Sequence, residues 1–435
     1  MSLYSELFYS QEVNGIFSDK NTVGCMLTVE AALAETQSVV GIISKESAQI
    51  ISGCCLPEMI DIEKLKRDAK LGGNAAIPLV QQLTKVVKNN DFESSKYVHL
   101  GATSQDIIDT GSILQIAEYL IWLESKLSVL KSTLTDITVK HKKTVMVGRT
   151  LLQQARPITF GLKTSAWLEG ICRSIERLVE MKNRLLVVQL SGAVGSQNKN
   201  ISTEVVNLFA QRLGLKPSFS WQSQRDNLNE LASKLGILSG SLGKIAKDVS
   251  LLMQTEVGEV FEGAAEGKGG SSTMPHKRNP VTCAAILANA TRVPHLVGSM
   301  LSAMLQEHER SAGNWHAEWE VLTEIMLLTA GSLEKTIDLL AGLEVDEKRM
   351  LANIEITQGL IFAENVSLAL ASKIGKIQAH ELVEKACKTA VLKNKHLKEI
   401  LIENNVEIEN LDELFNPENS IGNSVEIVER ILKKI

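Results

Sequence analysis

The chain has 435 residues, 44% of them hydrophobic and 22% charged, which is the balance of a soluble globular protein with a sizeable core. This length predicts two or three domains. The net charge of −5, without any stripe of basic residues interleaved with aromatic ones, argues against a nucleic-acid-binding protein. The chain has neither an apolar run long enough to cross a membrane nor a signal-peptide pattern at its start, so we expect a cytoplasmic protein.

The cysteines and histidines predict neither a disulfide framework nor a metal site. The 6 cysteines are sparse for this length and form no CxxC pair, so we interpret them as buried thiols. The 8 histidines follow neither HExxH nor another zinc-binding spacing, although His276, His308 and His316 lie within one short stretch. We therefore expect neither a metal nor another cofactor.

Taken in chain order, the first part, to about residue 104, predicts short helices separated by helix-breaking residues. The expected breaks are at Gly15, Gly24, Gly41, Gly53, Pro57 and the turn 72–74. Short helices return from about residue 355, with a loop at 416–419.

Between these two parts the sequence predicts five long helices. Apolar residues recur at alternating spacings of three and four through 113–137 and 228–252, which keeps one stripe of each helix facing a partner. Similar proline-poor stretches cover 159–188, 281–309 and 320–340, and we expect Pro294 to kink the second of these. Period-two alternation is rare, so strands are not expected.

These patterns predict an all-α fold in which a long-helix bundle, residues 105–354, is flanked by two smaller helical domains, 1–104 and 355–435. Helices with apolar residues beyond one face need further partners. The bundle therefore also predicts an oligomer assembled through these helices.

A polar motif stands just before the first long helix, where residues 99–106 read HLGATSQD. Thr103 and Ser104 are suited to capping that helix, because their hydroxyls accept hydrogen bonds from its free N–H groups. The same hydroxyls at a helix N-terminus also favour a bound carboxylate. The motif thus predicts either a helix cap or an anion site.

Two further segments place arginines ahead of long helices. Residues 148–157 read GRTLLQQARP, and Arg149 in this segment is either a surface ion-pair residue or a ligand contact. Arg225 lies at the start of the second heptad stretch and is a candidate for contacting a carboxylate.

The segment 263–279 joins a glycine-rich stretch to polar residues suited to chemistry, and its end, 270–279, reads GSSTMPHKRN. Glycines let the backbone swing or approach a ligand closely, so the segment is either an ordinary surface loop or a reactive lid. Lys277 and Asn279 supply donors suited to a carboxylate. Farther on, Arg310 is a third candidate, and Trp315 and Trp319 either pack together or wall a substrate pocket.

Residues 270–279 resemble the signature of the fumarase/aspartase superfamily, and 99–106 and 148–157 resemble its first and second substrate-binding segments. The resemblance implies a fumarase/aspartase-like fold and a homotetramer with active sites shared between chains. It implies a small di- or tricarboxylate substrate and no nucleic-acid or membrane partner. It assigns proton transfer to Ser271, assisted by Lys277. The residues that it assigns to substrate binding are His99, Thr103, Ser104, Gln105, Arg149, Thr150, Gln153, Arg225, Ser272, Met274, Asn279 and Arg310.

The chain departs from fumarase, adenylosuccinate lyase and argininosuccinate lyase at two positions. These enzymes place a histidine where this chain has Leu151, and commonly a glutamate holding that histidine where it has Ala284. Hydroxide and amine leaving groups need an acid, and general acid catalysis supplies roughly 10²–10⁴-fold. A carboxylate, whose conjugate acid has a pKa of about 4, attacks or departs without a proton. The joint absence favours a reaction in which the substrate's own carboxylate is the nucleophile.

Several segments, together spanning most of the chain, resemble the bacterial 3-carboxy-cis,cis-muconate cycloisomerase family. They are 17–19, 101–106, 274–281, 315–319 and 342–346. This resemblance implies closure of 3-carboxy-cis,cis-muconate to γ-carboxymuconolactone, a step of protocatechuate breakdown in the β-ketoadipate pathway. Leu151 departs from this family as well, since a tryptophan is common there. Two other functions stay open, which are an adenylosuccinate-type lyase that releases fumarate and a non-catalytic helical member of the superfamily.

Overall fold

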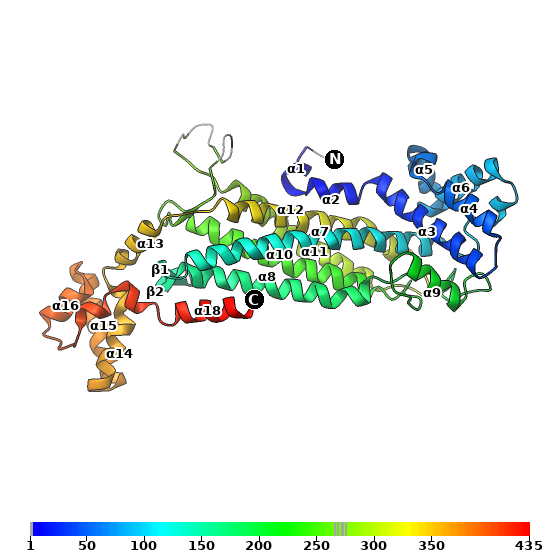
Figure 1. The fold of residues 1–435 in the computed structure, drawn as a ribbon. Helices are drawn as coiled ribbons and strands as arrows, with labels where there is room; N and C mark the ends of the chain where they lie inside the picture. Colours follow the sequence, from blue (N-terminus) through cyan, green and yellow to red (C-terminus); the bar gives the residue numbers. More distant parts are fainter. Residues whose placement is uncertain (1–2, 265–266, 268, 271–273, 275) are drawn as a thin grey trace. The chain divides into compact units, whose positions relative to one another are not determined.

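The computed structural model describes residues 3–264, 267, 269–270, 274 and 276–435, and helices dominate it (Figure 1). Six helices come first along the described chain, and all but the third, which has 21 residues, are short. They are α1 (Ser5–Phe8), α2 (Gln11–Ile16), α3 (Asp19–Val39), α4 (Lys45–Cys54), α5 (Ile62–Gly72) and α6 (Ala76–Asn90). Among the described residues, no helix is both long and apolar enough to span a membrane.

Five long helices follow, as the apolar periodicity predicted (Figure 1). They are α7 (Ser104–Lys140), α8 (Phe160–Leu185), α10 (Asp226–Leu252), α11 (Val281–Ala303) and α12 (Asn314–Ala341). The prediction was less accurate at the ends, since α11 stops at Ala303 rather than near residue 309 and α12 begins at Asn314 rather than near 320. The all-α fold class is confirmed.

The remaining helices are short. They are α9 (Thr203–Arg212), α13 (Glu347–Ile354), α14 (Ala363–Ile374), α15 (Lys376–Lys393), α16 (Leu397–Glu403), α17 (Leu411–Leu414) and α18 (Ser424–Lys434). Single 3₁₀ turns cover Pro57–Met59, Ser94–Tyr97, Glu355–Thr357, Leu360–Phe362 and Pro417–Ser420.

Three of the expected helix breaks in the first part are wrong. Gly15 lies inside α2, Gly24 inside α3 and Gly53 inside α4. The Ser18 hydroxyl caps α3 by accepting from the N–H of Asn21. A single glycine costs a helix only about 0.5–1 kcal/mol, which tertiary packing easily offsets. At Gly24 the missing side chain also admits a neighbour, because a Cβ there would lie 3.4 Å from Cγ of Pro57.

The described residues also contain two small antiparallel sheets that the sequence did not predict. β1 (Val145–Thr150) pairs with β2 (Gln153–Thr159), and β3 (Val260–Phe261) pairs with β4 (Glu344–Val345). The β1–β2 turn consists of Leu151 and Leu152, both left-handed with φ of 48° and 64°. Two-residue turns of this kind strongly prefer Asn-Gly or Asp-Gly. With a leucine pair at these positions, the turn residues do not predict the hairpin.

The chain divides into two compact units, and each long helix contributes to both. The first unit comprises residues 1–127, 174–242 and 288–334, and the second comprises 128–173, 243–287 and 335–435. The three domains proposed from the sequence divide the chain differently and stay a prediction.

In the first unit, the long helices pack through the predicted apolar stripes. The stripe of α7 from Ile113 to Leu127 is at most 1% exposed, and that of α10 from Leu228 to Leu242 at most 4%. Polar contacts add to this packing. Asn289 of α11 donates to the Leu328 carbonyl of α12 at 3.1 Å, and Lys182 of α8 pairs with Glu124 of α7.

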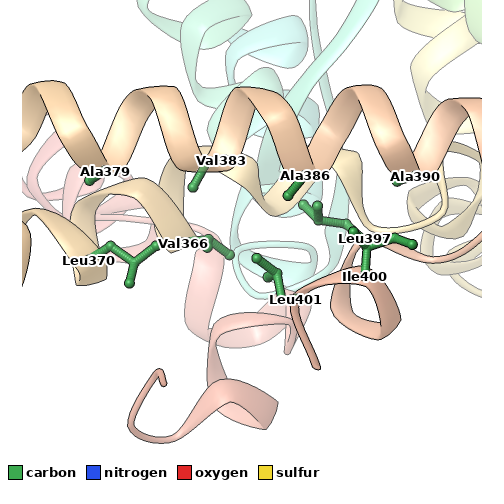
Figure 2. Close-up of a cluster of buried hydrophobic side chains, with 9 residues drawn as sticks. All are labelled: Val366, Leu370, Ala379, Val383, Ala386, Ala390, Leu397, Ile400 and Leu401. Atoms are coloured by element: carbon green, nitrogen blue, oxygen red, sulfur yellow. The ribbon is translucent and has the colours of Figure 1, made fainter. Parts of the chain in front are cut away.

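In the second unit, the continuing ends of the same helices are tied by buried polar contacts. The Thr138 and Thr164 hydroxyls join α7 to α8 at 2.9 Å, and Trp167 Nε1 donates to Asp248 of α10 at 2.9 Å. A separate apolar cluster holds α14, α15 and α16 together (Figure 2). Its α15 face is formed by Ala379, Val383, Ala386 and Ala390, whose small side chains let α14 approach closely.

Candidate active site

The first unit builds a polar cluster at the start of α7, made of Thr103, Ser104, Gln105 and Arg310, which we call the α7 cluster. Arg310 donates to Thr103 Oγ1 at 2.8 Å and to Gln105 Oε1 at 3.1 Å. Gln105 is fully buried, and its amide nitrogen donates to Asp109 and to the Gln222 carbonyl. The half-buried Ser104 hydroxyl has no hydrogen-bond partner among the described residues. The guanidinium and the free hydroxyl thus lie at the N-terminus of a long helix, where an anion is favoured.

Asp106 fixes the first turn of α7. Its carboxylate accepts from the N–H groups of Thr103, Ser191 and Gly192, and from the side-chain amide of Gln189. Burial raises the pKa of Asp106 to about 6, against these donors, which favour its charged form. The N–H of Thr103 thus donates to Asp106, while its hydroxyl accepts from Arg310. Among the described residues neither the Thr103 nor the Ser104 hydroxyl accepts from an N–H group of α7, so the contacts fit the polar site better than the predicted hydroxyl cap.

Arg225 is buried and fully committed to two carboxylates. It donates to Asp109 at 2.6 and 3.1 Å and to Glu318 at 2.6, 2.9 and 3.1 Å. Its side chain is 1% exposed. Asp109 also accepts from Trp315 Nε1 at 3.1 Å and from Gln105, so this ion-pair network lies directly behind the α7 cluster. The geometry gives Arg225 a supporting position, because its donors are occupied by the two carboxylates.

His99 lies a few residues before the start of α7 and has a left-handed backbone, with φ of 59°. Its Nδ1 lies 2.6 Å from a carboxylate oxygen of Glu30 in α3, a residue that is 1% exposed. Burial alone would lower the pKa of His99, but the charge and hydrogen bond of Glu30, aided by the charge of Asp106, raise it above its ordinary value. Sequence analysis identified His99 but missed Glu30.

In the second unit, the β1–β2 hairpin carries three predicted site residues. Arg149 forms a two-pronged ion pair with Glu259, at 2.6 and 2.9 Å, and Glu259 is fully buried. Thr150 and Gln153 face each other across the turn and are exposed. At the tip, Leu151 and Leu152 are 97% and 78% exposed. Arg149 is therefore an ion-pair residue in this chain, and Thr150 and Gln153 are open to solvent.

The lid segment is anchored at both of its ends by carboxylates. Glu262 accepts from the N–H groups of Thr282 at 3.1 Å and Cys283 at 2.8 Å, and so caps α11. Arg278 pairs with Glu344 at 2.8 and 2.9 Å and holds the pKa of that carboxyl below its ordinary value. Arg278 also donates to the Glu262 carbonyl at 2.6 Å. These contacts fix the positions from which the lid departs and returns.

Lys277 and Asn279 line a cavity of about 220 Å³ beside these anchors. The N–H of Asn279 donates to the Gly269 carbonyl at 2.9 Å, and a Cβ on Gly269, whose φ is 67°, would lie 2.8 Å from the Asn279 carbonyl oxygen. This close approach requires glycine. The Lys277 side chain is exposed and has no partner among the described residues, and Met274 is 43% exposed. Ser271 and Ser272 lie outside the described residues.

The predicted residues thus fall into two groups. The first unit holds His99, Thr103, Ser104, Gln105, Arg225 and Arg310, and the second holds Arg149, Thr150, Gln153, Met274, Lys277 and Asn279. Sequence reasoning missed the carboxylates that anchor them, which are Glu30, Glu259 and Glu262. Glu30 left a signal, because it interrupts a run of small and apolar residues in α3.

Comparison with known families places the chain. A family model described as "Lyase" matches residues 9–295, and one described as "Adenylosuccinate lyase C-terminus" matches 359–431. The chain belongs to the fumarase/aspartase superfamily.

Superfamily relatives match the chain over almost its full length. The 3-carboxy-cis,cis-muconate cycloisomerase of Acinetobacter baylyi is 46% identical, over 99% of this chain and 98% of the relative. A crystal structure of 3-carboxy-cis,cis-muconate lactonizing enzyme from Pseudomonas putida matches with a TM-score of 0.95 at 43% identity, covering 99% and 98% of the two chains. A crystal structure of fumarate lyase from Mesorhizobium sp. BNC1 matches with a TM-score of 0.89 at 35% identity, covering 98% and 99%.

Proposed function

We propose that this chain is an isomerase, a 3-carboxy-cis,cis-muconate cycloisomerase, which closes its substrate to γ-carboxymuconolactone. The observation that carries this proposal is the near full-length likeness to cycloisomerases at 42–46% identity in four bacteria. The reaction is a step of protocatechuate breakdown.

In this reaction, an oxygen of one substrate carboxylate attacks a carbon of a double bond and forms the lactone C–O bond. The electron pair of the double bond shifts toward the other carbon, and negative charge builds on the carboxylate attached there. A proton then joins that carbon. The enzyme must therefore bind several carboxylates, stabilise the developing charge and deliver one proton, and it has no leaving group to protonate.

We assign stabilisation of the charge that develops on the substrate carboxylate to Lys277 and Asn279, which line the cavity beside the lid anchors. Lys277 suits this task because its ammonium group has no partner among the described residues, and preorganised donors aimed at developing charge supply most of such an acceleration. Ser271 delivers or relays the proton. A serine hydroxyl is a weak acid and base at neutral pH, so it requires nearby donors and exclusion of water.

The α7 cluster binds a second carboxylate through Arg310, Ser104 and the N-terminus of α7. Arg310 has donors on one edge committed to Thr103 and Gln105, which fixes its orientation before substrate arrives. Arg225 and Arg149 act as supports, since each is paired to a buried carboxylate. The contacts assigned to Ser272, Met274, Thr150 and Gln153 remain proposals drawn from the family resemblance.

Leu151 and Ala284, the two residues at which the chain departs from the related lyases, agree with a reaction that needs no acid for a leaving group. Leu151 stands at the exposed hairpin tip, and Ala284 is exposed on the second turn of α11. Neither side chain can donate a proton or hold a histidine. Because lactone closure by a carboxylate needs no acid on the oxygen side, the loss of both groups leaves this chemistry intact.

The assembly that we propose is a cytoplasmic homotetramer with active sites shared between chains. The exposed apolar side chains of Leu151 and Leu152 support an assembly, since they would be buried by a second copy. Sedimentation of the purified protein tests this directly, and a monomer at micromolar concentration would contradict it.

The function is tested by adding 3-carboxy-cis,cis-muconate to the purified protein and following the loss of diene absorbance. We expect loss of absorbance with formation of the lactone. The matched arm is adenylosuccinate, because the C-terminal part of the chain matches the adenylosuccinate lyase model. Fumarate release from adenylosuccinate without any reaction of 3-carboxymuconate would assign the chain to the lyases instead, and inactivity on both would favour a non-catalytic member.

A further inference from the structure

The loop that leads into α7 is held in an unfavourable conformation by two side chains of one helix. Glu30 and Gln37 lie seven residues apart on α3, and therefore on the same face. Glu30 binds His99 Nδ1 at 2.6 Å, and Gln37 donates to the Leu100 carbonyl at 2.7 Å. The loop needs this support, because His99 has a left-handed backbone, which costs a residue other than glycine about 1–3 kcal/mol.

Glu30 itself is costly to keep where it lies. The carboxylate is 1% exposed, and its second oxygen, Oε2, is buried with no hydrogen-bond partner among the described residues. A buried carboxylate with one oxygen unsatisfied is destabilising unless a charged partner compensates for it. His99 is that partner, and an imidazolium compensates far better than a neutral imidazole.

The surroundings of His99 favour the same protonation state. Asp106 on α7 adds a second negative charge. Cys55, which follows α4, is another titratable group beside Glu30, and burial together with the Glu30 charge raises the pKa of its thiol, so it stays neutral. His99 Nε2 has no partner among the described residues, and the side chain keeps 19% of its surface exposed.

We propose that Glu30 is a positioning residue that keeps His99 as an imidazolium, whose free Nε2–H binds a substrate carboxylate beside the α7 cluster. The inference rests on the proposed function, since it assigns a charge to that substrate. In effect, Glu30 extends the pH range over which this part of the site is cationic. An imidazolium persists below its own pKa, so raising that pKa keeps the charge to higher pH. Loss of the Glu30 charge lowers the pKa of His99, so the imidazolium loses its proton at a lower pH.

The test compares Glu30→Gln with the wild type, because glutamine keeps an oxygen that accepts from Nδ1 but removes the charge. Glu35→Gln is the matched control, on the same helix but paired with Arg212. Trypsin releases residues 97–126 as a peptide with a single histidine, His99. Exchange of its ring C2 proton for deuterium, measured by mass spectrometry against pH, reports the pKa of His99 without any need for activity.

We expect a lower His99 pKa in Glu30→Gln and an unchanged one in Glu35→Gln. At a pH between the two measured His99 pKa values, the KM for 3-carboxymuconate should rise at least about tenfold in Glu30→Gln, the loss expected for a charge-assisted hydrogen bond, with kcat little changed. The difference in KM should shrink as the pH falls below the His99 pKa of the variant, because both proteins then carry the imidazolium.

An unchanged His99 pKa in Glu30→Gln overturns the proposal. So does a KM raised equally at every pH, because a loop that has merely lost its anchor would bind poorly whatever its charge. If the wild type does not turn over 3-carboxymuconate, the proposed function fails, and the dissociation constant for that compound replaces KM. Absence of binding, or binding that does not follow the His99 pKa, then overturns the inference as well.

Discussion

The two groups of candidate site residues are built in opposite ways. Apart from the Ser104 hydroxyl, the side chains of the α7 cluster and the residues behind it are paired with one another, as in the Arg225 network with Asp109 and Glu318. The lid segment is anchored at its ends by Glu262 and Glu344, while the Lys277 side chain has no partner in the described chain.

The difference separates binding from chemistry in physical terms. Groups that only bind carboxylates work best when their positions are set before substrate arrives, and buried ion pairs set them. Groups that meet charge formed during the reaction must keep their donors free. We therefore expect substitutions behind the α7 cluster to reduce stability, and substitutions in the lid to reduce turnover at constant stability.

The largest effect on turnover is expected for Ser271→Ala, which removes the proposed proton donor. The rate should fall by roughly 10²–10⁴-fold, the usual contribution of general acid–base catalysis, while the proposed tetramer stays intact. Steady-state turnover of 3-carboxymuconate and sedimentation measure the two quantities. Wild-type rates would remove Ser271 from the mechanism.

The largest effect on stability is expected for Arg225→Met. Removing one partner of a buried ion pair leaves Asp109 and Glu318 uncompensated and costs about 3–5 kcal/mol in the free energy of unfolding. Denaturant unfolding measures this, with Arg184→Met as the control, because Arg184 makes a solvent-exposed pair with Glu230. Equal losses in both variants would show that the buried Arg225 network contributes no more to the free energy of unfolding than an exposed ion pair does.

Lys277→Met tests the opposite side of the comparison. We expect kcat/KM for 3-carboxymuconate to fall about 100-fold, because one charged donor to the reacting carboxylate is lost. The unfolding midpoint should not move, since Lys277 pairs with nothing in the described chain. Lys247→Met, at an exposed position on α10, is the control. A large loss of stability in Lys277→Met would contradict the contrast between the two groups.

Glu262→Ala should give a smaller and mixed effect. It removes the acceptor for the first N–H groups of α11, a change that costs about 1–2 kcal/mol when a helix cap is lost. The variant keeps the bond from Arg278 to the backbone carbonyl of residue 262, but it loosens the first turn of α11, which begins directly after the lid segment, so we expect kcat to fall more than KM rises. Denaturant unfolding and steady-state kinetics on one preparation measure the stability and kcat. A loss of stability without any change in kcat would show that Glu262 does not influence the lid during the reaction.

The smallest effect should be a gain. Replacing Leu151 and Leu152 together by Asn and Gly gives the turn residues that suit two left-handed positions, and should stabilise the fold by about 1 kcal/mol. Thermal unfolding at a protein concentration that dissociates any assembly measures it. If the leucines are buried in an assembly, the same variant should weaken association, so a stable, fully assembled variant would argue against their burial there.

The sequence was most informative where a pattern is local. Spacings of three and four placed α7 and α10 closely, because apolar periodicity reflects one buried face of one helix. The lid and residues 103–105 of the α7 cluster were found for a similar reason, since each belongs to a continuous motif that resembles a known family.

What the sequence did not reveal are pairs of distant residues and one unusual turn. Arg149 and Glu259 are 110 positions apart, and His99 and Glu30 are 69 apart. Nothing local distinguishes a carboxylate that will be buried against such a partner from one on the surface. The hairpin was missed because leucines stand where its backbone favours asparagine and glycine. Without the hairpin, the sequence could not decide whether Arg149 forms an ion pair or contacts a ligand.

The most direct test of the central claim is to run the reaction with 3-carboxy-cis,cis-muconate in D₂O and examine the product by NMR. A carboxylate that adds without any leaving group, followed by delivery of a single proton, predicts γ-carboxymuconolactone with one deuterium on the carbon beside the acceptor carboxylate. Unreacted substrate under conditions where the Pseudomonas putida enzyme forms the lactone would contradict the account.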